Sequence, residues 1–254
     1  MNTSPIAALD AAVERFRSRF GLPGSVLKII AIVTMLIDHT GASVVLKLAR
    51  HMNTYHTVHA QQVTDLYYLM RRIGRFAFPI FCFLLVEGFL HTHDVKKYLS
   101  RMLVFALLSE IPYDWALNHP GFTHQNVYWT LLIGLLVLWC VSMYEGAIPV
   151  QLAIMAGGML LASAMKTDYS YKGVFLIELL YVLKSTRIFQ CLCGGAFVLY
   201  ENWPTPFAFL PVLLYNGKRG RQMKYFFYAF YPGHLIVLGV INNLILPNYI
   251  QYIK

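Results

Sequence analysis

Long runs of apolar residues recur along almost the whole chain, and they limit the folds that it can adopt. One run covers Ser25–Leu46 and another covers Phe226–Leu246. A helix needs about 20 such residues to cross the ~30 Å hydrocarbon layer of a membrane. The runs are continuously apolar, whereas the strands of a membrane β-barrel alternate apolar and polar residues. The sequence therefore predicts an all-α, polytopic transmembrane bundle, in which each helix satisfies its own backbone hydrogen bonds.

Composition excludes the main alternative, a water-soluble domain. Of the 254 residues, 57% are hydrophobic and only 13% are charged, which is about half the charged share of a typical soluble domain. Cys82, Cys140, Cys191 and Cys193 all lie within apolar runs, and this placement argues against a disulfide framework or a CxxC zinc site. The net charge of +9 comes with no soluble basic domain, so we expect no nucleic-acid partner.

About nine apolar segments make up the expected bundle. They are Ser25–Leu46, Ile73–Leu90, Tyr98–Ala116, Val127–Ser142, Ala147–Met165, Lys172–Leu183, Ile188–Tyr200, Pro206–Tyr215 and Phe226–Leu246. The seventh and eighth segments are short and are separated by the proline-containing sequence Trp203–Pro206. They could instead form a re-entrant hairpin, and in either case the chain returns to the side that it left.

The first 24 residues precede the bundle and predict an amphipathic helix over residues 5–20. Val13, Phe16 and Phe20 share one face, and arginines surround the rest. A short basic amphipathic helix of this kind lies on the anionic inner surface of a membrane; the alternative is a solvated tail. We therefore divide the chain into a cytosolic segment, 1–24, and a single transmembrane domain, 25–254, that contacts membrane lipid.

The basic residues predict which way the bundle is oriented. With a cytosolic N-terminus, most of the 21 lysine and arginine residues lie in cytosolic connections, as the positive-inside rule requires. We therefore expect a multi-pass protein of the inner or plasma membrane. The range 47–72 is an exception, because we expect it to be a long outer loop although it contains several basic residues. Its three histidines, His51, His56 and His59, are a weak signal for metal, so no metal is expected.

Polar residues within the apolar segments gather at two depths, and the first cluster lies towards the outer ends. Its members are Asp38, His39, Arg75, Glu110, Asp114, Asn126, Asp168 and Tyr171. Ionisable residues inside a membrane are costly and are functional hypotheses by default. A histidine beside a carboxylate and facing an arginine suits proton transfer with stabilisation of charge. The alternative is a structural ion pair between Asp38 and Arg75 that joins the first two spans.

Basic side chains predominate in the second cluster, at the inner ends of the segments. It contains Glu87, His91, Lys97, Arg101, the loop Lys218–Lys224 and His234. Basic groups beneath a membrane bundle bind either lipid head groups or a polyphosphate ligand. Both possibilities remain open from the residues alone.

These residues resemble the signatures of the TraX family of integral membrane proteins. The likeness rests on Leu27–Ala31 with Met35, Asp38, His39 and Gly41, on Gly74–Phe81, on Glu87–Phe89 with His91 and Thr92, on Tyr98, Arg101 and Ser109–Pro112, on Asp168, Tyr171 and Gly173, and on Phe230–Pro232 with His234 and Leu235. It extends over residues 27–245. The family's best-known function is N-terminal acetylation of conjugative pilin, and the family is similar in plan to larger membrane acyltransferases that use acyl-CoA.

The resemblance implies a membrane acyltransferase, most simply an N-acetyltransferase, that uses acetyl-CoA from the cytosolic side. The acceptor would be an amine or hydroxyl of a peptide or protein, such as a pilin-like N-terminus, or of a small molecule, reached from the outer side. The loop 47–72 is not typical of the pilin acetylases, so the acceptor need not be pilin.

Each candidate residue receives an expected role. His39 would take the acceptor's proton or carry the acetyl group, Asp38 would orient His39, and Arg75 would stabilise the oxyanion. The acceptor site would be formed by Arg72, Glu110, Asn126, Asp168 and Tyr171. Acetyl-CoA would be bound by His91, Lys97, Arg101, Lys218, Arg219 and His234.

A transporter of protons or small solutes is the alternative function. Its path would use intramembrane residues such as Asp38, Arg75, Glu87 and Glu178. The sequence shows no internal inverted repeat of the kind found in many transporters, and its polar clusters are basic at one depth and mixed at the other. Both features favour the enzyme.

Overall fold

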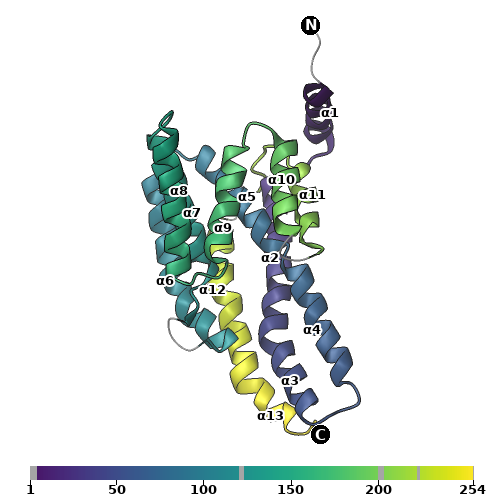
Figure 1. The fold of residues 1–254 in the computed structure, drawn as a ribbon. Coiled ribbons are helices and arrows are strands. Elements are labelled where there is room, and N and C mark those ends of the chain that lie inside the picture. Colours follow the sequence, from purple (N-terminus) through teal and green to yellow (C-terminus); the bar gives the residue numbers. More distant parts are fainter. Residues whose placement is uncertain (1–4, 120–122, 200–202, 222–223, 254) are drawn as a thin grey trace.

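The computed structural model describes residues 5–119, 123–199, 203–221 and 224–253, and these form helices and the turns that join them (Figure 1). The helices are α1 (Pro5–Phe20), α2 (Gly24–Thr40), η1 (Gly41–Val45), α3 (Leu46–Thr54), α4 (Ala60–Gly74), α5 (Ala77–Leu90), α6 (Val95–Leu117), α7 (Val127–Met143), α8 (Ile148–Ala164), α9 (Ser170–Val182), α10 (Arg187–Leu199), η3 (Thr205–Ala208), α11 (Phe209–Leu213), α12 (Lys224–Val240), η4 (Ile241–Ile245) and α13 (Leu246–Ile250). The predicted all-α class is confirmed.

Three long helical units are able to cross a membrane by their length and composition. They are Gly24–Thr54, which joins α2, η1 and α3, Ala60–Leu90, which joins α4 and α5, and Tyr225–Ile250, which joins most of α12 with η4 and α13. Their apolar character and length make this a membrane protein. The other predicted segments also coincide with helices, but many of these are short, so the number of about nine spans stays a prediction. Tyr200, the last residue of the seventh predicted segment, lies outside the described residues.

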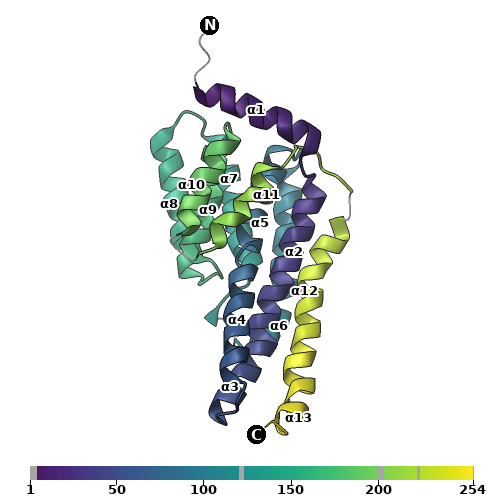
Figure 2. The same cartoon turned by 90° about the vertical axis from the view of Figure 1, so that its right-hand side faces the viewer.

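The units Gly24–Thr54 and Ala60–Leu90 run along most of the height of the molecule, Tyr225–Ile250 lies in the part farther from α1, and α7–α11 lie only in the half nearer to α1 (Figure 1). Helix α1 lies across this end of the bundle, roughly perpendicular to the other helices (Figure 2). We call it the α1 end, and we call the opposite end, where α3, α4 and α13 meet, the α13 end. Polar groups at the lower ends of the shorter helices therefore lie at mid-height along the long ones.

Helix α1 keeps the amphipathic character that the sequence predicts. Phe16 and Phe20 are 52% and 63% exposed, and their rings contact each other with centroids 5.4 Å apart. Arg17 is buried instead and forms an ion pair with Glu14. An exposed apolar pair on a helix that lies across the bundle end is the arrangement of an interfacial helix.

The predicted long loop over 47–72 is wrong. The range forms most of a helical hairpin, in which α3 packs against α4 and only residues 55–59 connect the two. It contains no glycine or proline, and Ala49, Met52 and Ala60 are buried at the hairpin interface or near it. Apolar residues spaced by three or four positions favour a packed helix even where charged residues are frequent.

The apolar core surrounds α5. Ile80, Phe83 and Val86 on this helix are fully buried, as are Leu135 on α7 and Ile177 on α9. A helix that is apolar on every side is stable only when neighbours cover it completely. The rigid α5–α7–α9 core therefore holds the neighbouring polar groups in place.

Candidate functional site

Two histidines from opposite ends of the chain form the centre of the candidate site. Nδ1 of His39, on α2, lies 2.7 Å from Nε2 of His234, on α12. The ring planes are within 3° of parallel and the centroids are 5.0 Å apart. This separation equals the N–N distance plus the two ring radii, so the rings are coplanar and meet edge to edge. Both residues are buried, and the geometry is that of a strong, well-aligned hydrogen bond.

The hydrogen bonds around the pair determine where the protons lie when both rings are neutral. Nδ1 of His234 is 2.8 Å from the carbonyl oxygen of Phe230, which can only accept, so this nitrogen carries the proton. Nε2 of His234 then has a lone pair and accepts from Nδ1–H of His39. Nε2 of His39 is therefore the nitrogen with a free lone pair, as a general base or nucleophile requires.

Irregular helical geometry follows each of these histidines along its own helix. The π-helical turn η1 begins two residues after His39, and η4 begins seven residues after His234. The two turns contact each other. Single π-helical turns within α-helices occur frequently at functional sites.

Asp38 does not orient His39 as the sequence analysis expected. Its carboxylate pairs with Arg71 on α4, because consecutive residues on a helix point about 100° apart. The close approach of α2 and α4 requires Gly74, where a Cβ atom would lie 2.1 Å from Cβ of Asp38. The structural alternative, an ion pair between the first two spans, is thus realised, but with Arg71 in place of Arg75.

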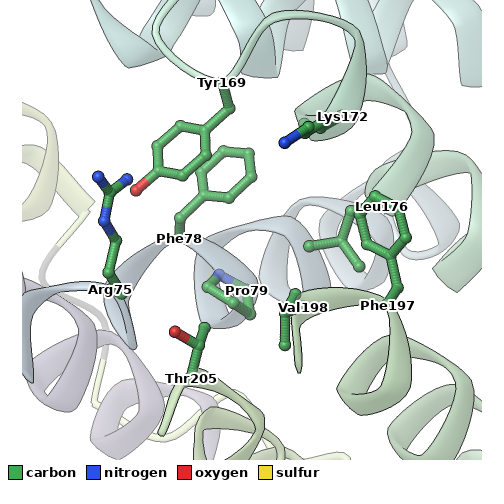
Figure 3. Close-up of a pocket in the computed structure, with 10 residues that line it drawn as sticks. Arg75, Phe78, Pro79, Tyr169, Lys172, Leu176, Phe197, Val198 and Thr205 are labelled. Atoms are coloured by element: carbon green, nitrogen blue, oxygen red, sulfur yellow. The ribbon is translucent and has the colours of Figure 1, made fainter. Parts of the chain in front are cut away.

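Arg75 lies where α4 ends, and its guanidinium turns towards the hydroxyl end of Tyr169 (Figure 3). The guanidinium carbon is 5.8 Å from the centre of the Tyr169 ring, and this ring stacks on Phe78 with centroids 3.5 Å apart. Arg75 also interacts electrostatically with Asp38 and Asp168. These partners hold the arginine at the junction of α4, α5 and α9.

The five residues expected to form the acceptor site separate into three groups. Glu110 on α6 accepts hydrogen bonds from the Asn126 amide and, at 3.0 Å, from the Trp129 indole. Asp168 lies in the turn before α9, close to Arg75. Arg72 and Tyr171 are exposed. The structure therefore brings Glu110 and Asn126 together, whereas Arg72 and Tyr171 lie on the surface.

Asp168 lies in the connection between α8 and α9. The residue is exposed, yet burial among the surrounding atoms raises the pKa of its carboxyl, and the neighbouring Arg75 and Arg71 guanidiniums oppose this rise. On the same side of the bundle, burial and the adjacent His124 lower the pKa of His119. Both groups lie in connections between helices, at the ends of the shorter helices that face the α13 end.

A cavity of about 400 Å³ extends from the α1 end into the bundle, a size typical of small-molecule sites. Exposed His91 and Arg219 line it at the α1 end, and Met35, Val127 and Tyr231 line its deep end. The Tyr231 ring contacts both His39 and His234, with centroid distances of 5.8 Å and 5.6 Å. The cavity thus reaches to within one side chain of the histidine pair.

Three of the six residues expected to bind acetyl-CoA line this cavity: His91, Arg101 and Arg219. Lys97 and Lys218 are exposed near its mouth. His234 was expected among the basic residues of the inner end, but it lies deep in the bundle beside His39.

Several cavity and site residues were missed by the sequence analysis. Lys28 lines the cavity, with its ammonium group 5.4 Å from the centre of the Phe227 ring. A single lysine within the first apolar run is a signal that could have found it. Arg71 and Tyr169 carry no comparable signal. Arg72 and Tyr171 are residues of the same kind nearby in the sequence, and only the packing of the helices decides which of them contacts Asp38 or Arg75.

A family model described as TraX protein matches residues 23–242. One relative is the probable fimbrial assembly protein FimC, serogroup H1, of Dichelobacter nodosus, which is 27% identical over 244 residues covering 84% of this chain and 92% of the relative. No solved structure matches the chain.

Proposed function

The chain belongs to the TraX family, and from this premise we propose that it is an integral membrane acyltransferase that moves an acetyl group from acetyl-CoA to an acceptor amine or hydroxyl. The relative's name connects that protein with fimbrial assembly. We therefore favour the N-terminal amine of a pilin-like protein as the acceptor. Transfer to an amine would form an amide and release free CoA.

The cavity beside the histidine pair is the observation that carries this proposal. Lys28, Arg101 and Arg219 line it, and their positive charges suit the phosphates of CoA. Among the described residues, one carboxylate lines its wall, that of Glu87, and it is paired with Arg187 at 2.9 Å, so its charge is compensated. A thioester on a long, flexible arm would enter this cavity from the basic end and reach Tyr231, whose ring contacts both histidines.

His39 supplies the proton transfer in the proposed reaction. Its free Nε2 takes a proton from the attacking amine, and the amine nitrogen then bonds to the thioester carbon. When the carbon–sulfur bond breaks, the CoA thiolate takes the proton back from His39. General-base catalysis of this kind contributes about 10²–10⁴-fold to the rate. The alternative, in which Nε2 itself carries the acetyl group, uses the same nitrogen.

The two ends of the bundle would then serve different substrates. CoA is cytosolic, so the basic α1 end would face the cytosol, in agreement with the orientation that the positive-inside rule predicts. The acceptor would approach from the side of the α13 end, where exposed Asp168, in the connection between α8 and α9, can attract an ammonium group.

The experiment follows CoA release by purified protein in lipid nanodiscs, given acetyl-CoA with and without a pilin-derived N-terminal peptide. We expect His39→Ala to lose nearly all turnover and to remain folded. His59→Ala, a change at an exposed histidine outside the site, serves as the matched control and should retain activity. Wild-type turnover in His39→Ala would refute the assignment of the base.

Transport remains the second candidate because of Glu178. This residue, on α9, is 2% exposed, and one of its carboxylate oxygens has no hydrogen-bond partner among the described residues. Buried carboxylates in membrane helices often belong to proton paths. Proton flux into liposomes in the absence of acetyl-CoA, abolished by Glu178→Gln, would favour transport over acyl transfer.

A further inference from the structure

The hydroxyl of Tyr231 is a buried polar group that the proposed mechanism leaves unused. Tyr231 is 3% exposed, and its hydroxyl oxygen has no hydrogen-bond partner among the described residues. A buried polar group without a partner costs about 1–3 kcal/mol, so such groups are rare in native proteins and call for an explanation. The residue lines the deep end of the cavity, which suggests that a ligand supplies the partner.

The surroundings of Tyr231 place it beside the reacting groups. Its ring meets the rings of His39 and His234 edge to face, and it also meets Tyr128 in this way at a centroid distance of 5.0 Å. Tyr231 precedes His234 by three residues on α12, so both side chains lie on the same face of that helix. A carbonyl group of a ligand at the deep end of the cavity would therefore meet the Tyr231 side chain next to the histidine pair.

A second hydrogen-bond donor lies at the same point, at the beginning of α7. Val127 is the first residue of this helix and lines the cavity, and the first amides of a helix have no partner within it. The side chain of Asn126 accepts from the amide of Tyr128 at 3.0 Å, whereas the amide of Val127 lies near the Tyr231 hydroxyl without forming a hydrogen bond to it. The positive end of the helix dipole adds to the attraction for negative charge.

We propose that the Tyr231 hydroxyl and the Val127 amide form the oxyanion hole that holds the acetyl oxygen of the donor thioester. This inference rests on the proposed function. When the acceptor nitrogen bonds to the carbonyl carbon, the π electron pair moves to the oxygen, and both donors stabilise the negative charge without giving up a proton. The pair returns when the carbon–sulfur bond breaks and CoA leaves. Tyr231 and Val127 thus take the role that the sequence analysis gave to Arg75.

The test compares Tyr231→Phe with wild type in the full-length protein. Loss of one oxyanion-hole donor lowers kcat by about 10²–10³-fold, and we expect this loss with an unchanged KM for acetyl-CoA. The melting temperature should not fall, because the deleted hydroxyl has no partner in the free protein. Tyr181→Phe, at a buried tyrosine on α9 that packs against Phe89, is the matched control and should retain wild-type kcat.

A spectroscopic readout separates this inference from the proposed function. Acetyl-CoA labelled with ¹³C at the carbonyl is bound to His39→Ala, which does not turn it over, and to His39→Ala/Tyr231→Phe. We expect the infrared carbonyl band to lie at a lower frequency in the first variant, because a hydrogen bond weakens the C=O bond. A wild-type protein that neither binds nor consumes acetyl-CoA would refute the proposed function. If acetyl-CoA is consumed, a wild-type kcat in Tyr231→Phe or an unshifted band would refute the oxyanion hole alone.

Discussion

At the scale of single residues, hydrogen-bond direction decides which atom can react. The Phe230 carbonyl fixes the proton on His234, and His234 in turn fixes the proton on His39. Only Nε2 of His39 keeps a free lone pair. In the proposed reaction His234 would be a positioning residue, since it would act through His39 without touching the substrate.

Replacement of His234 by alanine tests this chain of hydrogen bonds. Without an acceptor for its Nδ1–H, the His39 ring loses its fixed tautomer and orientation, and misplacement of a reacting group by about 1 Å can cost 10²-fold in rate. We expect kcat for CoA release to fall by about that factor.

Chemical rescue distinguishes positioning from a general loss of structure. Added imidazole should restore part of the kcat of His234→Ala, and His234→Gln, whose side-chain oxygen can accept from His39, should be less affected. A His234→Ala protein with wild-type kcat would show that His39 needs no partner.

At the scale of elements, the beginning of α7 connects structure with chemistry. Asn126 is fully buried and caps the helix through Tyr128, while its amide donates to the Ala106 carbonyl at 2.8 Å and to Glu110. One side chain thus ties α7 to α6 and fixes the position of the Val127 amide.

Asn126→Ala should therefore destabilise the protein. Loss of an N-cap alone costs about 0.5–2 kcal/mol, and the Ala106 carbonyl and Glu110 would each lose a buried partner as well. We expect a lower melting temperature in detergent, with Asn248→Ala, at an exposed asparagine of α13, as the control. Equal melting temperatures for the two variants would contradict the role of this cap.

At the scale of the whole molecule, positively charged side chains gather towards the α1 end of the cavity. Lys28, Arg101 and Arg219 line it, and the histidine pair lies beyond its deep end. This arrangement predicts that the donor's phosphates are bound electrostatically, at a distance from the reacting carbonyl.

A charge reversal at the exposed mouth tests this separation. Arg219→Glu should raise KM for acetyl-CoA with little change in kcat, because the side chain acts on the phosphates and not on the transition state. The rise should shrink as salt is added, since ions screen exposed charges. A fall in kcat at unchanged KM would place Arg219 at the chemistry instead.

Much of this molecule could be predicted from the sequence, because membrane insertion is decided locally. Apolar runs must form helices wherever water is absent, so the all-α class and the positions of the helices follow from composition along the chain. The presence of His39 inside the bundle and the basic character of one end follow in the same way from costly residues within apolar runs. The hairpin of α3 and α4 was missed, because charged residues obscured its helical spacing.

The partners of these residues were decided by tertiary structure alone. His39 meets a histidine 195 residues away, and Asp38 selects Arg71 over Arg75. Such choices depend on the rotation of each helix about its axis and on the angles at which helices pack, and neither quantity is expressed in the spacing of residues along one chain. The cavity and the unpaired Tyr231 hydroxyl exist for the same reason, because only the packed bundle encloses them.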